Sequence, residues 1–232
     1  MKEDKRIAIV LARSGSTRLP NKNMLKIGGK TLTERAVEAG IGAGLNVIVS
    51  SNSKVILEHI NSKNVSNYLR SESNADNFST SESAVQETIN AFQIADSTEI
   101  ILLQPTSPMR TSDTVKRFLT EWDSPGVFDR FDSAFSVTQE SNEYWVNIDS
   151  ELVRLSKLVF GKETITRSQD RPPLYKENGA IYLTRAGNIR NGERFITGKK
   201  YSFLCSKFES IDIDTAEDLK VAEAIYERSK RK

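Results

Sequence analysis

The chain has 232 residues, and its 33 Lys and Arg side chains against 31 Asp and Glu leave a net charge of +2. A chain of this length can bury one sizeable core without disulfides or structural metals, and its balanced charge implies no strong attraction to nucleic acid or to an acidic membrane. With Cys205 the single cysteine and His59 the single histidine, an internal disulfide is excluded, and a Ser–His–Asp triad, a Cys–His pair or a zinc cluster would depend on His59 alone. Because His59 lies in a helical pattern, we expect it on a helix surface, and catalysis must then use carboxylates, Arg or Lys, hydroxyls and a metal ion.

The sequence carries no segment suited to a membrane. No run approaches the roughly 18 apolar residues that span a bilayer, and residues 1–6 lack the apolar core of a signal peptide. Cys205 lies in an apolar run over 201–205, where a buried thiol in a reducing compartment is the simplest interpretation. We therefore expect a soluble, cytoplasmic protein that contacts neither membranes nor nucleic acid.

The first predicted element is a buried strand over 7–11, IAIVL, which is too short and too β-branched for a helix. A loop with Gly15 and two serines follows, and Arg13, Arg18 and Lys22 bring positive charge to it. In an open α/β sheet, ligands bind beyond the carboxyl ends of the strands, so this loop is suited to hold phosphates. The loop matches neither GxxxxGK[ST] nor GxGxxG, and composition alone leaves a solvated basic loop as an equal alternative.

Apolar spacing then predicts alternating helices and strands. The alternation indicates an α/β fold with a doubly wound, parallel sheet, of which 7–11 is the central strand. A long polar loop over 71–83 is expected to be functional or mobile, because connections of this length on such a scaffold usually are. The elements expected in this half are a helix over 31–42, a strand over 46–50, a helix from Ser53, a strand over 65–70, a helix over 82–95, a strand over 100–103 and a helix over 111–122.

The alternation breaks over 123–177, where the short runs 134–137 and 145–148 have no helix between them. Such a segment predicts an extended arm or hairpin, and a small β projection is a common way to build a dimer contact. We expect one domain over 1–232 that contains this excursion. The elements expected after it are strands over 180–183, 201–204 and 210–213 and a final helix from Thr215, where Asp218 completes a near capping box.

Two carboxylates follow the last predicted strand. In a strand, Ile211 and Ile213 point into the core while Asp212 and Asp214 project together from the other face. Paired carboxylates at a strand end suit Mg²⁺, which takes one or two of them together with substrate phosphates. The alternative is that Asp214 caps the last helix and Asp212 is merely exposed.

Two further segments carry polar groups at strand ends. Gln104 opens a turn stiffened by two prolines and closed by Arg110, and its amide can bind a substrate hydroxyl or carboxylate or simply the backbone. In the run 178–182, NGAIY, the glycine allows close backbone approach and Tyr182 supplies an amphipathic wall, although a core strand is the simpler interpretation.

Taken together and in this order, four segments resemble the acylneuraminate cytidylyltransferase family, the CMP-sialic acid synthetases, over essentially the whole chain. The resemblance implies a Rossmann-like, mostly parallel sheet with helices on both faces, of the nucleotidyltransferase type, and a homodimer built partly from an extended arm. It also implies Mg²⁺-dependent transfer of CMP from CTP to the anomeric hydroxyl of a 2-keto acidic sugar, with release of pyrophosphate. The related CMP-Kdo synthetases are the alternative, because GSTRLP is similar to them too. The four segments are ARSGSTRLPNKN (12–23), LLQPTSPMR (102–110), ENGAIY (177–182) and SIDIDTAEDLKVAE (210–223).

The resemblance also implies roles for individual residues, with Lys22, Arg13 and Asp212 at the reacting phosphate. Relatives often carry an arginine where Ser168 stands here, and the neighbouring Arg167 is the candidate to replace it in contacting the sugar. The remaining roles are triphosphate contacts at Arg13, Ser16 and Lys22, cytosine and ribose contacts at Asn23, Arg70 and Ser83, the sugar pocket at Gln104, Tyr182 and Phe195, and Mg²⁺ ligands at Asp212 and Asp214.

Overall fold

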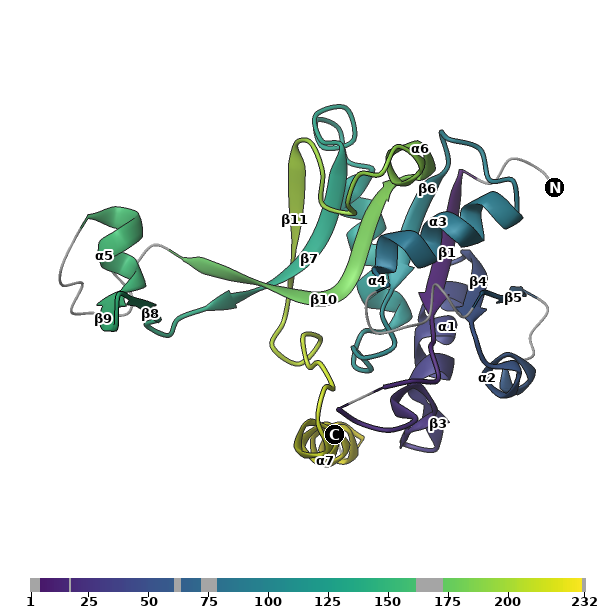
Figure 1. Cartoon of the computed structure of the whole chain (residues 1–232), viewed down its shortest axis with the longest axis horizontal. Coiled ribbons are helices and arrows are strands. Elements are labelled where there is room, and N and C mark those ends of the chain that lie inside the picture. Colours follow the sequence, from purple (N-terminus) through teal and green to yellow (C-terminus); the bar gives the residue numbers. More distant parts are fainter. Residues whose placement is uncertain (1–4, 17, 61–63, 72–78, 162–172, 231–232) are drawn as a thin grey trace.

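A computed structural model describes residues 5–16, 18–60, 64–71, 79–161 and 173–230. Within these residues a seven-stranded sheet has the order β11-β7-β10-β6-β1-β4-β5 (Figure 1). The apolar run IAIVL lies in an interior strand, as predicted, with β6 on one side and β4 on the other. The strands of the sheet are β1 (Arg6–Leu11), β4 (Asn46–Ser51), β5 (Val65–Leu69), β6 (Glu99–Leu103), β7 (Ser133–Glu140), β10 (Leu174–Arg185) and β11 (Lys200–Cys205).

The sheet is mostly parallel, and β10 is the strand that departs from this. β10 runs antiparallel to both β6 and β7, while the other paired neighbours are parallel. Parallel neighbouring strands need a crossover connection, which is usually a helix. Antiparallel β7 and β10 need none, and the chain between them forms a projection that starts and ends at the same edge of the sheet. The expected Rossmann-like, mostly parallel α/β sheet is therefore confirmed, with one reversed strand.

Helices cover both faces of the sheet. The side chains of β1 therefore alternate between two cores, one on each face. Ala8 and Val10 pack with α1, α2 and α4, whereas Ile7 and Ile9 pack with α3 and α6 on the other face. All four side chains are buried, which accounts for a run that is apolar on both faces. The helices of these layers are α1 (Leu32–Gly42), α2 (Lys54–His59), α3 (Ser81–Ala91), α4 (Ser112–Trp122) and α6 (Ala186–Arg190). No helix in the described part of the chain combines the length and apolar character that a membrane span requires.

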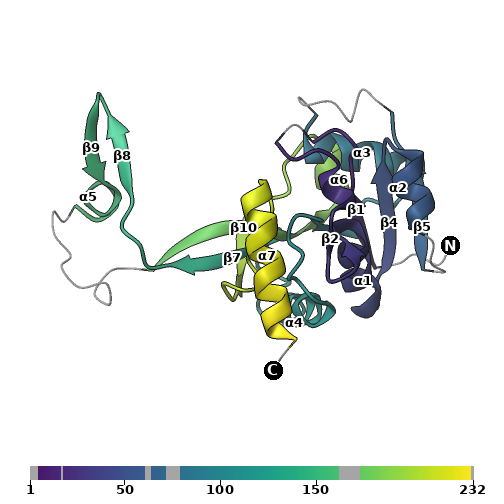
Figure 2. The same ribbon diagram turned by 90° about the horizontal axis from the view of Figure 1, so that it is seen from below.

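The last helix, α7 (Ala216–Ser229), packs against a short hairpin of β2 (Lys26–Ile27) and β3 (Lys30–Thr31) rather than against the large sheet. Figure 2, which views the molecule from below, shows α7 in front of the sheet. A small core holds the contact together, formed by Ile27, Leu32, Met109, Ile213 and Ala222. This core brings the end of the basic loop and the start of α7 to the same side of the molecule.

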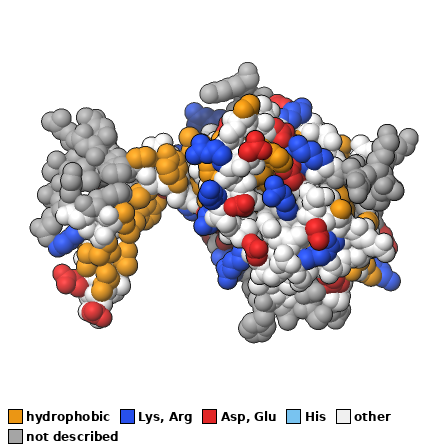
Figure 3. Space-filling model, turned by 90° about the horizontal axis from the view of Figure 1, so that it is seen from above, with side chains coloured by type: hydrophobic (Ala, Val, Ile, Leu, Met, Phe, Trp, Pro, Cys, Tyr) orange, Lys and Arg blue, Asp and Glu red, His pale blue; other side chains and the backbone are white. Residues whose placement is uncertain are grey.

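The arm extends from the ends of β7 and β10 and consists of β8 (Trp145–Ile148), β9 (Glu151–Arg154) and α5 (Leu155–Phe160) (Figure 1). The run 134–137, which we grouped with this excursion, instead lies in β7 of the main sheet. Hydrophobic side chains are exposed along the arm (Figure 3). The large ones are Tyr144, Trp145, Val146, Ile148, Leu152, Leu158, Val159 and Tyr175.

The strand predicted over 210–213 is wrong. The chain leaves the sheet after Cys205, and residues 211–214 form no helix or strand and pair with no strand in the described part of the chain. The alternation of apolar and polar residues is misleading here, because Ile213 is fully buried and its N–H donates to the carbonyl of Thr106 (2.9 Å) rather than to a neighbouring strand.

Cys205 is part of the core, as expected, and its burial raises the pKa of the thiol to about 11. His59 lies exposed at the end of α2, with its Nε2 3.3 Å from a carboxylate oxygen of Glu34.

Candidate active site

The basic loop after β1 is fastened to the end of the neighbouring strand β4. The N–H of Ala12 donates to the carbonyl of Ser50 (3.0 Å), and the N–H of Ser14 donates to Oδ1 of Asn52 (3.0 Å). Arg13 and Ser16 are half-buried in this loop. Asn52 did not stand out in the sequence, although a polar side chain directly after a buried strand marks the carboxyl edge where ligands bind.

Asn23 braces the same loop from within. It lies in the single-turn helix η1 (Lys22–Met24), which follows Asn21 in the left-handed region at φ 52°. The Asn23 side chain is buried, and its Nδ2 donates to the carbonyl of Arg13 (2.8 Å). Its own carbonyl accepts from the hydroxyl of Thr33 (2.8 Å). In this structure Asn23 shapes the loop, and its contact with cytosine or ribose stays a prediction.

The loop and the aspartate pair meet in space. Lys22 Nζ lies 3.0 Å from Oδ1 of Asp214, although the two residues are 192 positions apart. Arg18 Nη1 lies 3.0 Å from Oδ2 of the same carboxylate. The helix cap is Thr215, whose hydroxyl accepts from the N–H of Asp218 while the Asp218 carboxylate accepts from the N–H of Thr215. The predicted capping box is thus confirmed, and the alternative that Asp214 caps α7 is wrong.

Asp212 lies two residues before Asp214, and its side chain is exposed. The surrounding protein nevertheless displaces enough water from its carboxyl group to raise the pKa of Asp212, and the neighbouring Asp214 carboxylate acts in the same direction. A hydrogen bond with Thr106 and the charge of Lys22 oppose this rise. Both carboxylates therefore lie close to one another and to the lysine of the loop.

Gln104, Tyr182 and Phe195 line a common cavity of about 290 Å³, as the sugar-pocket prediction requires. The Tyr182 and Phe195 rings pack with centroids 5.9 Å apart. Tyr182 donates to Glu177, and burial together with this contact raises the pKa of Tyr182, as does the more distant charge of Asp212. The cavity therefore lies within electrostatic reach of Asp212. The charged side chains at its wall, which the sequence did not indicate, are Glu82, Glu177 and Arg194.

Arg70 is buried just beyond β5, and its Nε has no hydrogen-bond partner among the described residues. Burial lowers the pKa of Arg70, with a further contribution from the charge of Arg13, while Glu87 acts in the opposite sense. Ser83 lies one turn before Glu87 on α3, and its hydroxyl donates to the carbonyl of Thr80 (2.9 Å). An unpaired, buried guanidinium nitrogen beside a second arginine fits an absent anionic or acceptor-rich ligand.

Arg110 has a structural role that the sequence did not predict. Its guanidinium is fully buried and donates to the carbonyls of Gln104 (3.0 Å) and Ala180 (2.8 Å). These bonds tie the residue that follows β6 to the middle of β10, and both strands contribute to the cavity. Burial lowers the pKa of Arg110 to about 10. Arg167 lies outside the described residues, so its expected place beside the sugar stays a prediction.

The donor set at the aspartates fits Mg²⁺. The described residues contain no group of three or more His, Cys, Asp or Glu side chains arranged to hold a metal, and the site offers the two carboxylates of Asp212 and Asp214. Mg²⁺ keeps most of its water and needs few protein ligands when a triphosphate supplies others. Two hard oxygen ligands beside a cationic loop match that requirement.

Comparison with known proteins places this chain in a family. The cytidylyltransferase family model matches residues 7–230. The chain is 30% identical over 218 residues, 92% of its length, to an N-acylneuraminate cytidylyltransferase of Streptococcus agalactiae serotype V, but spans only 51% of that relative. It is 31% identical to a CMP-N,N'-diacetyllegionaminic acid synthase of Legionella pneumophila, covering 95% of this chain and 96% of the relative.

Solved structures agree on the fold. A CMP:2-keto-3-deoxy-manno-octonic acid synthetase complexed with CTP superposes with a TM-score of 0.66 at 17% identity, covering 97% of this chain and 100% of the other. A 4-diphosphocytidyl-2C-methyl-D-erythritol synthase also gives 0.66, at 10% identity and 95% and 98% coverage. Together with the near-complete match of the family model, these findings confirm the resemblance seen in the sequence: the chain belongs to the cytidylyltransferase family.

Proposed function

We propose that the protein transfers CMP from CTP to the anomeric hydroxyl of a nonulosonic acid, in a Mg²⁺-dependent reaction that releases pyrophosphate. The observation that carries the proposal is the meeting of Lys22 and Arg18 with Asp214, next to Asp212, whose charge acts on Tyr182 at the wall of the cavity. The names of the Streptococcus and Legionella relatives support a nonulosonic acid as acceptor. CMP-Kdo synthesis is the alternative, and the octonic acid synthetase among the structural neighbours supports it through fold alone.

The reaction is an in-line displacement at phosphorus. The anomeric oxygen of the sugar forms a bond to the α-phosphorus of CTP, the bond from that phosphorus to the β-phosphate oxygen breaks, and the hydroxyl proton passes to solvent. Such a step asks the protein mainly to position the reactants and to stabilise negative charge. Lys22 supplies charge at the α-phosphate, and Arg13 and Ser16 hold the triphosphate with the backbone of the loop. A site without histidine is sufficient for this chemistry.

Asp212 and Asp214 would hold the Mg²⁺ ion, which when bound neutralises the charge of the triphosphate and draws its oxygens into place. In the ligand-free protein, Asp214 is instead satisfied by Lys22 and by Arg18, whose side chain is 69% exposed. Both cations can turn from the carboxylate to phosphate oxygens, because the same guanidinium and ammonium groups bind either anion. Ligand binding therefore exchanges partners rather than burying unpaired charge.

The rest of the site selects the two substrates. Asn23, Arg70 and Ser83 are assigned to the cytosine and ribose. The buried Nε of Arg70, which has no hydrogen-bond partner among the described residues, supports a ligand contact there. Gln104 contacts the acidic sugar, with Arg167 as a further candidate. Tyr182 and Phe195 supply the aromatic part of the wall of the sugar pocket, and Glu82, Glu177 and Arg194 supply its charged part.

The purified protein incubated with CTP, Mg²⁺ and one acidic sugar at a time tests the substrate. Pyrophosphate release is expected with a nonulosonic acid such as N-acetylneuraminic or legionaminic acid, together with a CMP-sugar detected by mass spectrometry. Turnover with Kdo alone would replace the proposal by its alternative. CTP binding without pyrophosphate from any acid would contradict both, and tight binding of a finished CMP-sugar in that case would indicate a glycosyltransferase.

We also propose that the arm forms a homodimer with a second copy of the chain. The described part of the arm exposes a row of large apolar side chains, and a two-stranded hairpin needs a packing partner. Sedimentation is expected to give twice the chain mass, and Leu152→Ser with Val159→Ser is expected to shift it towards the monomer. Val55→Ser, on an equally exposed apolar residue of α2, is the matched control. A double variant that still sediments as a dimer would refute the assignment.

A further inference from the structure

A tight turn over 206–210 links β11 to the segment that carries both aspartates. The N–H of Ser210 donates to the carbonyl of Ser206 (3.1 Å), and the Ser210 hydroxyl donates to the same oxygen (2.8 Å). The turn belongs to no helix or strand. Its position must therefore be set by side chains that reach it from neighbouring elements.

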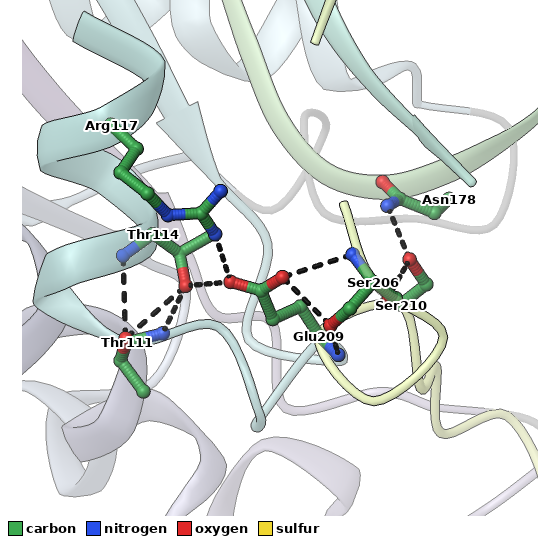
Figure 4. Close-up of polar contacts among 7 residues, drawn as sticks. All are labelled: Thr111, Thr114, Arg117, Asn178, Ser206, Glu209 and Ser210. Carbon is green, nitrogen blue, oxygen red and sulfur yellow. Dashed lines mark hydrogen bonds and ion pairs between the residues drawn. The ribbon is translucent and has the colours of Figure 1, made fainter. Parts of the chain in front are cut away.

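Glu209 fastens the turn to α4 (Figure 4). Its Oε1 accepts from the hydroxyl of Thr114 (2.6 Å) and pairs with Arg117, and its Oε2 accepts from the N–H (2.9 Å) and hydroxyl (2.8 Å) of Ser206. The Glu209 side chain is 14% exposed, compared with 51% for Arg117. Burial alone would raise the pKa of Glu209, but the hydrogen bonds from Thr114 and Ser206 outweigh it and lower the pKa, so the carboxylate is ionised.

Asn178 holds the opposite side of the turn (Figure 4). Its Nδ2 donates to the hydroxyl of Ser210 (2.8 Å), while its Oδ1 accepts from the hydroxyl of Ser136 (2.5 Å) and the N–H of Ala180 (3.1 Å). Asn178 belongs to β10, and its buried side chain bonds to Ser136 of the neighbouring strand β7. The turn is therefore fixed to α4 through Glu209 and to the sheet through Asn178.

Downstream of the turn, the aspartate segment is anchored in the core at Ile213. The two carboxylates have contacts of their own, Asp212 with Thr106 and Asp214 with Lys22 and Arg18. The N–H of Ile213 donates to Thr106, and its side chain is fully buried. Between this anchor and the turn, the only backbone hydrogen bond donated from the described chain is that of Ile211 to Phe208, at 3.4 Å. The direction of Asp212 therefore depends on the turn before it, as well as on Ile213 after it and on its own hydrogen bond with Thr106.

We propose that Glu209 is a positioning residue for the aspartate pair: by fixing the 206–210 turn on α4 it holds Asp212 and Asp214 at the spacing that binds Mg²⁺ together with CTP. This inference rests on the proposed function. Glu209 touches neither the cavity lined by Tyr182 nor the basic loop in the structure. Its effect is transmitted through the backbone, in the way that groups behind a metal ligand commonly orient it.

The test is Glu209→Gln. The replacement keeps the shape of the side chain but puts an amide N–H₂ group in place of one carboxylate oxygen. This donor then faces the donors of Ser206 or Arg117, so hydrogen bonds are lost and the turn loosens. We expect the Mg²⁺-induced gain in CTP affinity, measured by calorimetry without any sugar, to fall about tenfold. Loss of a group that orients a metal ligand commonly lowers metal affinity by at least this factor. CTP affinity without Mg²⁺ and KM for the sugar acid should be unchanged. Glu209→Asp, which retains the charge, should recover part of the effect.

The matched control is Glu121→Gln. Glu121 also joins α4 to β11, by accepting from the hydroxyl of Tyr201 (2.9 Å), but at the end of the helix far from the aspartates. Its variant should keep the full Mg²⁺-induced gain. Should Glu209→Gln fail to fold, Ser210→Ala removes one hydroxyl from the same turn and should shift Mg²⁺ coupling in the same direction. If the Glu209 and Ser210 variants keep the same Mg²⁺-induced gain in CTP affinity as the wild type, the inference is overturned. If Mg²⁺ does not raise the CTP affinity of the wild type either, the proposed metal site is overturned as well.

Discussion

Replacing Lys22 with alanine is expected to lower kcat by about 10²- to 10³-fold, which corresponds to roughly 3–4 kcal/mol of lost transition-state stabilisation, the usual effect of removing one preorganised donor. The reason is positional. The ammonium group lies on a braced turn, with 16% of its side chain exposed and with Asp214 3.0 Å away. It is thus held beside the proposed metal pair before any substrate arrives, and its charge cannot be replaced by a mobile surface cation.

The measurement is pyrophosphate release at saturating CTP and sugar. Lys26→Ala is the matched control, because Lys26 is an exposed lysine on β2 four residues further along the same segment. Its variant should turn over as the wild type does. A Lys22 variant with near wild-type kcat would show that this lysine is a surface residue and that the charge at the α-phosphate comes from elsewhere.

Asp212→Ala and Asp214→Ala are each expected to abolish most activity and to raise the Mg²⁺ concentration that the residual activity needs. Neither variant should lose much stability, because the Lys22 and Arg18 contacts of Asp214 are partly exposed, and pairs of that kind contribute about 0–1 kcal/mol. Relief of repulsion between the two carboxylates works in the opposite direction. Thermal melting and Mg²⁺ titration of turnover measure the two effects separately.

The double variant is the sharper experiment. Two residues that hold one ion act as a unit, so removing the second should cost little more than removing the first. Thr215→Ala provides the contrast, because it deletes the cap of α7 and should cost about 1 kcal/mol of stability without shifting the Mg²⁺ requirement. Additive losses of turnover in the double variant, with an unchanged Mg²⁺ dependence, would leave the shared-ion interpretation without support.

Local pattern predicted the elements well where one physical requirement dominates. The run over 7–11 has to be a buried strand because every side chain in it is apolar, and Thr215 with Asp218 has to begin a helix because both side chains satisfy free N–H groups. The segment over 211–214 was misassigned because its apolar and polar residues alternate, as they do in a strand. The same alternation arises in an unpaired segment that packs on a core with Ile213 buried and Asp212 exposed. The reversal of β10 was missed because periodicity carries no strand direction.

The site was predictable only as separate pieces. Residues after buried strands mark a ligand edge, which is how Arg13 and Gln104 were found, and the resemblance supplied their roles. The contact of Lys22 with Asp214 spans 192 positions and exists because α7 packs on the β2–β3 hairpin. No local pattern contains that packing. The clamp made by Arg110 was likewise invisible, since its two acceptors are backbone carbonyls on different strands.

The irregularity in β10 separates two parts of one strand. Residues 174–177 pair with 140–137 of β7, but Tyr182 pairs with Phe135, so the register shifts across the bulge, where Gly179 adopts φ +73°. A one-residue slip in an unbroken strand would turn every side chain to the opposite face. Here an insertion in the stem of the arm can be absorbed at the bulge, and Tyr182 keeps its face towards the cavity. The bulge therefore separates the length of the arm from the packing of Tyr182 at the wall of the cavity.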